Sequence, residues 1–226
     1  MAENKNAPVQ SVEPNEIVDK VTGFWEKNSK NILIALAAIV VIAGGIFGYK
    51  YLVAEPAERK ANDAIFRAQQ YFQQDSLDLA LNGDATNPGF LKIIDKHSGT
   101  PAANLSKFYA GAIYLRQGDF AKAEKYLKEF STSSPQISAR AKSLLADAYA
   151  EQGKNEEAAK LYREAAGIFE KDEFNSAEYL FRAGFLYESM GKNKEAIEAY
   201  KLIKEKYPRS ERGFEVEKYL ARLGEF

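Results

Sequence analysis

A pattern of small and large residues recurs three times between residues 111 and 200. Each copy is centred on a glycine between two predicted helices, and these glycines lie 35 and then 38 residues apart: Gly118, Gly153 and Gly191. A spacing of roughly 34 residues is typical of a repeated helical hairpin, in which each repeat is one helix–turn–helix unit. The chain is therefore predicted to be all-α and to stack such hairpins one on another.

Further positions keep the same distance from the turn glycine in every copy. A small residue and a tyrosine precede it, where the two helices of a hairpin approach each other: Gly111, Ala146 and Gly184, with Tyr114, Tyr149 and Tyr187. An alanine and a bulky residue on one helical face follow it: Ala123, Ala158 and Ala196, with Leu127, Tyr162 and Tyr200. Unrelated amphipathic helices would not keep this register three times.

The register resembles the tetratricopeptide repeat (TPR) family, and the resemblance implies an α-solenoid. Repeats are expected at about residues 102–137, 138–173 and 174–209, with Pro135 and Pro208 closing the first and the third. Residues 55–101 are predicted to form a degenerate first repeat, made of a helix over 55–74, a connecting loop over 75–89 and a shorter helix over 89–97. Residues 210–223 are predicted to form a capping helix with Ser210 as its N-cap, completing a TPR-like domain over residues 55–226.

An uncharged stretch precedes this domain. Residues 31–49 contain no Asp, Glu, Lys or Arg, and 19 residues of helix extend about 28 Å, close to the roughly 30 Å of a bilayer core. A cleaved signal peptide would have its apolar core nearer the start of the chain and a small-residue cleavage site after it. We therefore predict an uncleaved single-pass membrane helix over residues 31–53. The flanking charges are balanced and do not fix its orientation.

Residues 1–30 form the segment before this helix. The first 14 are polar and without periodicity, which predicts a disordered tail. A weak helical pattern begins at Asn15 and includes Trp25. Two interpretations remain open for it: a short interfacial helix with Trp25 at the depth of the lipid headgroups, or a plain helical lead-in.

Small residues lie along one stripe of the apolar span, namely Ala37, Gly44 and Gly48. A Gly-x-x-x-Gly pair allows two membrane helices to approach closely, which predicts docking against a partner helix or a second copy. The alternative is that glycine is simply common in membrane helices.

Composition excludes several classes of function. The chain has no cysteine, so disulfides and thiolate chemistry are not expected. Its net charge is −1, so it has no basic field that would attract nucleic acid. The single histidine, His97, stands at a predicted helix end, where a capping role is the simplest interpretation. No phosphate loop, zinc spacing or nucleophile motif occurs, so we expect no enzyme, no cofactor and no metal site.

The TPR resemblance implies a concave groove lined by the first helix of each repeat. Carrying the groove positions onto this sequence gives nine residues: Phe108, Leu115, Arg116, Arg140, Asp147, Glu151, Phe181, Phe185 and Glu188. The subtype that clamps a C-terminal carboxylate has Lys, Arg and Asn at the inner positions, which this chain lacks. An apolar peptide or a partner helix is the better match. The alternative is that Phe181 and Phe185 only pack against neighbouring helices.

The whole arrangement resembles the YfgM-like family, the membrane-anchored TPR ancillary subunits of the bacterial SecYEG translocon. The resemblance rests on the anchor, the segment Asp95–Ala102 and the turn Gly118–Glu124. It implies an inner-membrane protein with a cytoplasmic N-terminus and a periplasmic TPR domain. It also implies three kinds of partner: translocon subunits, a membrane-anchored periplasmic chaperone of the prolyl-isomerase type, and unfolded or extended client proteins.

Two alternatives share the predicted architecture. An organellar import receptor would place the repeats in the cytosol, often with the carboxylate clamp that is missing here. A general envelope-assembly scaffold of the outer-membrane lipoprotein type would carry a lipidated cysteine, and this chain has none.

Overall fold

The computed structural model describes residues 14–225, and within that range every regular element is a helix, as the sequence predicts. Contacts divide the chain into two units, the first ending at Pro56 and the second beginning at Ala57. The predicted disordered tail lies almost entirely outside the described residues.

The first unit consists of α1 (Pro14–Tyr49) and a short π-helix (Lys50–Ala54). The helical run Val21–Gln73 includes an 18-residue window with a mean hydropathy of 2.6, long and apolar enough to cross a membrane, and none of that window is buried. Apart from the adjacent residues and the nearby backbone of the same helix, no heavy atom lies within 4 Å of a Cβ built on Gly44 or Gly48, and Ala37 is exposed. The small-residue stripe is therefore open, and its docking role stays a prediction.

The second unit begins within α2 (Glu55–Gln73) and continues with α3 (Leu77–Asn82) and α4 (Phe90–Lys96). The predicted inner side of α2 is buried at Ala61, Ile65 and Ala68. The prediction of a plain loop over residues 75–89 is wrong in one respect, because α3 lies inside it. This helix has only six residues and is stabilised by the burial of Ala80 and Leu81. A segment of that length is too short to show a helical period in the sequence.

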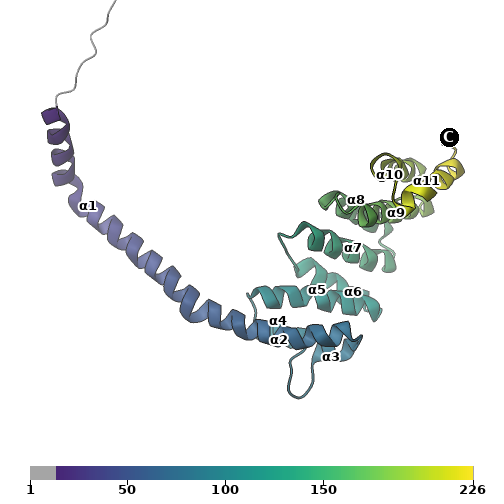
Figure 1. Cartoon of the computed structure of the whole chain (residues 1–226), viewed down its shortest axis with the longest axis horizontal. Coiled ribbons are helices and arrows are strands. Elements are labelled where there is room, and N and C mark those ends of the chain that lie inside the picture. Colours follow the sequence, from purple (N-terminus) through teal and green to yellow (C-terminus); the bar gives the residue numbers. More distant parts are fainter. Residues whose placement is uncertain (1–13, 226) are drawn as a thin grey trace, which may run out of the picture. The chain divides into compact units, whose positions relative to one another are not determined.

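Three helical hairpins and a final helix follow, each helix packing on the next (Figure 1). Their bounds are α5 (Pro101–Arg116) with α6 (Phe120–Glu129), α7 (Pro135–Glu151) with α8 (Asn155–Ile168), α9 (Glu173–Ser189) with α10 (Asn193–Lys206), and α11 (Glu211–Arg222). The turn glycines have φ angles of +79°, +73° and +72°, a left-handed conformation that glycine adopts without steric penalty: Gly118, Gly153 and Gly191.

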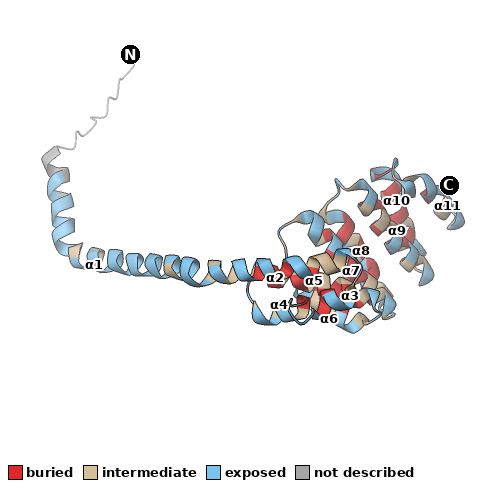
Figure 2. Cartoon of the chain, turned by 60° about the horizontal axis from the view of Figure 1, so that its bottom comes forward, coloured by how far each residue is buried: buried red, intermediate tan, exposed pale blue. Residues whose placement is uncertain are grey.

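Close approach inside each hairpin explains the small–large pattern. A Cβ on Gly184 would lie 2.5 Å from the ring of Tyr200, and one on Gly111 would lie 2.6 Å from Leu127. The first and third hairpins therefore need glycine on one helix because the other helix fills that space. Figure 2 shows the resulting buried residues on the faces that the helices of the second unit turn toward one another, whereas α1 is exposed.

Side-chain caps fix where several helices begin. At the starts of α5, α6, α9 and α11, a side-chain oxygen of the N-cap residue accepts a hydrogen bond from a backbone N–H group; these N-cap residues are Thr100, Asp119, Asp172 and Ser210. Ser210 is thus the N-cap of the last helix, as the sequence predicts. Pro135 is the first residue of α7, where its missing N–H costs no helical hydrogen bond.

Candidate functional site

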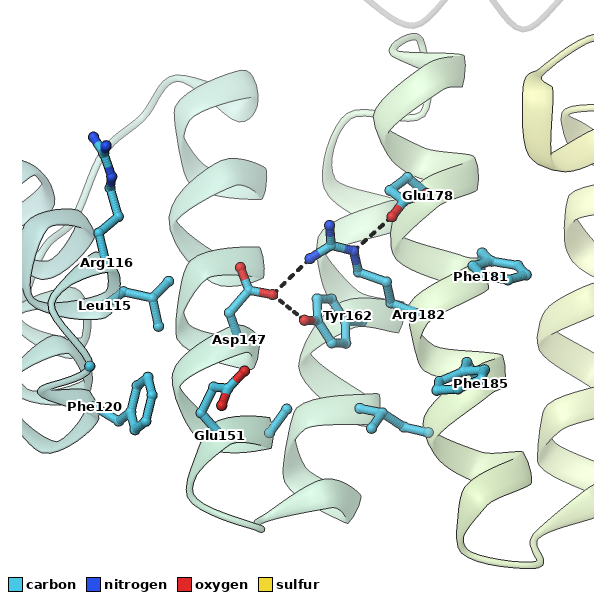
Figure 3. A pocket seen from close by; sticks show the side chains of 13 residues that line it. Leu115, Arg116, Phe120, Asp147, Glu151, Tyr162, Glu178, Phe181, Arg182 and Phe185 are labelled. Carbon is cyan, nitrogen blue, oxygen red and sulfur yellow. Dashed lines mark hydrogen bonds and ion pairs between the residues drawn. The ribbon is translucent and has the colours of Figure 1, made fainter. Parts of the chain in front are cut away.

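A groove of about 620 Å³ runs across the first helices of the three hairpins. Its walls come from α5, α7 and α9, with contributions from the start of α6 and from α8. The lining residues are Leu115, Arg116, Gly118, Phe120, Asp147, Ala150, Glu151, Tyr162, Glu178, Phe181, Arg182, Phe185 and Leu186 (Figure 3).

A polar network links two hairpins across the groove. One oxygen of Asp147 on α7 accepts hydrogen bonds from the hydroxyl of Tyr162 and from Nη1 of Arg182, the latter at 2.8 Å (Figure 3). The Nε atom of Arg182 donates to Glu178 on its own helix, also at 2.8 Å. Because the partners come from α7, α8 and α9, this network fixes how the second and third hairpins meet.

The network continues from α9 to α11. Nε of Arg212 donates to the second carboxylate oxygen of Glu178 at 2.7 Å, and Nη1 of Arg212 reaches Glu215 at 3.0 Å. The guanidinium carbon of Arg212 also lies 4.0 Å from the ring centroid of Phe181. Cations over aromatic faces are attracted by the ring quadrupole, so Arg212 holds Phe181 against the end of the stack.

These contacts shift the pKa values of ionisable side chains in the groove. Burial, together with the charge of Asp147, raises the pKa of Tyr162 above its usual value. Burial opposes the charge on Glu178, but hydrogen bonds from Arg182 and Arg212 outweigh it and lower the pKa of that carboxyl. The Glu178 carboxylate and both guanidinium groups therefore stay charged at neutral pH.

The apolar part of the groove contains an exposed aromatic ring. Phe185 on α9 is 53 % exposed, although it is one helical turn from the partly buried Phe181. Leu115 and Phe120 from the first hairpin and Leu186 from the third complete the apolar surface. A large aromatic side chain left in water inside a groove is a candidate anchor for a ligand.

Charge in the groove is unevenly paired. Arg116 forms an ion pair with Asp75 at 2.5 Å, and Arg182 is engaged by Asp147 and Glu178. Glu151, the last residue of α7, is exposed, and its carboxylate forms no ion pair and accepts no hydrogen bond among the described residues.

The structure brings six of the nine predicted residues into the groove: Leu115, Arg116, Asp147, Glu151, Phe181 and Phe185. Phe108 instead packs against Phe130 and Tyr109. Arg140 is exposed elsewhere on α7, and Glu188 accepts hydrogen bonds from Tyr200 and Arg222. These three do not belong to the lining of the groove.

Glu178 and Arg182 are not among the groove residues that the sequence predicts, and Tyr162 is predicted only as a packing residue. Glu178 and Arg182 are four residues apart and lie on the same face of α9 as Phe181 and Phe185. The four-residue spacing of Glu178 and Arg182 is the sequence signal that could have placed both residues at the groove. The partner of Arg182 on α7, Asp147, is 35 residues away in the sequence, and this pairing follows only from how the hairpins pack.

No group of three or more His, Cys, Asp or Glu side chains suited to a metal ion occurs among the described residues. His97 is the C-cap residue of α4 and does not line the groove. The groove combines apolar surface, paired charges and one unpaired carboxylate. Such a surface is suited to binding a ligand.

Comparison with known proteins assigns a family. No curated protein matches the chain. A solved structure, BtubC (BKLC) from P. vanneervenii, is similar at 18 % identity with a TM-score of 0.42, and the match covers 76 % of this chain and 65 % of that one. The chain thus spans slightly less than two thirds of that relative's length. Residues 22–220 match the tetratricopeptide repeat-like domain, and the chain belongs to this family.

Proposed function

We propose that this protein is a membrane-anchored interaction module that holds a segment of another polypeptide in the groove between α5, α7 and α9. Tetratricopeptide repeat-like domains are protein–protein interaction modules, and solenoids of this kind present extended concave binding surfaces. The observation that carries the proposal is the ring of Phe185, which is 53 % exposed within the groove.

The charges of the groove favour an internal segment of the ligand over a free C-terminus. A clamp for a terminal carboxylate needs cations that are available to it. Arg116 is paired with Asp75, and Arg182 with Asp147 and Glu178, so a ligand carboxylate would have to compete with existing ion pairs. An apolar side chain meets no such competition at Phe185.

The resemblance to the YfgM-like family is the basis for a more specific proposal about location, topology and partners. We place the protein in the bacterial inner membrane, with a cytoplasmic N-terminus and the repeats in the periplasm. Its partners there would be translocon subunits, met in part through Ala37, Gly44 and Gly48, and a membrane-anchored periplasmic chaperone. The single apolar helix supports the anchoring. A reporter fused to the C-terminus distinguishes this topology from that of an import receptor with cytosolic repeats.

Replacing Phe185 by serine tests the groove. The change should remove an aromatic anchor worth about 2 kcal/mol, which is roughly thirtyfold in Kd, without disturbing a buried side chain. We expect the polypeptides that co-purify with the full chain from native membranes to fall by at least tenfold, measured by quantitative mass spectrometry.

Phe174→Ser is the matched control for this experiment. Phe174 is 64 % exposed on the same helix and does not line the groove, so its removal should leave co-purification unchanged. Equal recovery with both variants would show that the groove is not the binding surface.

A further inference from the structure

The C-terminal end of α7 carries uncompensated negative charge inside the groove. The last turn of this helix contains no basic residue, and Glu151 is its final residue. By contrast, α5 ends in Arg116, at the corresponding position of the preceding hairpin. Aligned peptide dipoles place a partial negative charge at the C-terminus of a helix, so a carboxylate there is unfavourable and a cation is favourable.

Nearby cations do not neutralise this end of the groove. Nη1 of Arg182 is taken up by Asp147 and Nε of the same side chain by Glu178. Asp147, one turn before Glu151 on α7, is itself paired with Arg182, so Glu151 is the carboxylate on this face that has no partner among the described residues. The electrostatic field at the end of α7 therefore favours a positively charged ligand group.

Apolar surface and this unpaired charge face the same groove. Figure 3 shows Glu151 on α7 and Phe185 on the neighbouring first helix, α9, on opposite sides of it. A ligand segment that satisfies both must carry an apolar side chain and a cationic side chain.

We propose that the occupant of the groove is a partner polypeptide segment in which a lysine or arginine pairs with Glu151 while an apolar side chain of the same segment packs on Phe185. The proposal rests on the proposed function and adds the chemistry of its ligand. Glu151 is the residue that selects basic segments, and Phe185 supplies affinity that does not depend on charge.

Selection from a library of random 12-residue peptides displayed on phage tests this preference. The full chain in lipid nanodiscs is the target, and empty nanodiscs remove background binders. We expect enriched peptides to contain Lys or Arg in excess over Asp and Glu, together with Phe, Leu, Ile or Trp. Enriched peptides that lack a basic excess would overturn the proposal.

Charge reversal at Glu151 then assigns the preference to one residue. Binding of synthetic selected peptides to Glu151→Lys should weaken by roughly tenfold, because attraction is replaced by repulsion. Glu157→Lys makes the same charge change at an exposed position of α8 outside the groove lining and should alter binding by less than twofold. Peptides with Lys or Arg replaced by Glu should regain affinity for Glu151→Lys.

The outcomes separate this inference from the proposed function. Peptides that lose binding to Phe185→Ser but bind Glu151→Lys as well as the unsubstituted chain would leave the groove function standing and overturn the basic preference. Selected peptides that do not depend on Phe185 would overturn both. Sedimentation that shows a dimer dissociated by Glu151→Lys would identify the occupant as a second copy of this chain and overturn the assignment to a partner.

Discussion

Replacing Tyr200 by alanine is expected to lower the free energy of unfolding by about 3–5 kcal/mol, the usual range for a large aromatic side chain removed from a core. Tyr200 is completely buried, and its ring fills the space left by Gly184. Its hydroxyl donates to Glu188 at 3.1 Å, and its ring also contacts Phe181. The substitution would leave a cavity at the centre of the third hairpin.

Chemical denaturation of the full chain in detergent, followed by far-ultraviolet circular dichroism, measures this effect. Tyr200→Leu is the informative control, because Leu127 occupies the same position against Gly111 in the first hairpin. The leucine variant should lose less than half as much stability as the alanine variant, since most of the volume is kept. A loss below about 1 kcal/mol for Tyr200→Ala would contradict the packing described for the hairpins.

The double substitution Val40→Arg and Val41→Asp is expected to release the protein from the membrane. Both residues lie in the middle of the apolar part of α1 and are exposed. A charged side chain at the centre of a membrane helix costs about 2.5–3.5 kcal/mol on insertion scales, so two charges should prevent stable insertion. Fractionation by ultracentrifugation should move the chain from the membrane pellet to the soluble fraction.

Asn62→Arg provides the control for this change. It places an arginine beside Asp63 on the exposed side of α2, and thus creates the same pair of charged residues outside the apolar span. That variant should stay in the pellet. If the variant with both valines replaced also stays there, the apolar helix is not what anchors the chain.

The hairpins could be predicted from the sequence because their signal is local and repeated. The small residue, the tyrosine, the turn glycine and the alanine recur within about 12 residues, and the turn glycines as well as Gly111 and Gly184 have a steric reason for their places. The α3 helix could not be predicted in the same way. It has six residues, too few to show a helical period, and it forms because tertiary contacts bury Ala80 and Leu81.

The groove was harder to predict than the fold that carries it. The position of a residue within a repeat predicts that its side chain lies on the groove side of the stack. Contacts with neighbouring side chains then determine whether it remains accessible to a ligand. Phe108 is covered by Phe130, and Glu188 is taken up by Arg222 from α11. The pairing of Asp147 with Arg182 depends on the rotation of one hairpin against the next, which no local pattern encodes.

Site-specific photo-cross-linking measures directly whether another polypeptide lies against Phe185, as we propose. Benzoylphenylalanine at position 185 keeps the native phenyl ring, extends it by a benzoyl group, and on irradiation reacts only with groups in contact with it. Irradiation of native membranes should produce defined higher-mass adducts from position 185, and these should be absent when the probe stands at position 174 of the same helix. Absence of adducts at position 185, or identical adducts at both positions, would contradict the account.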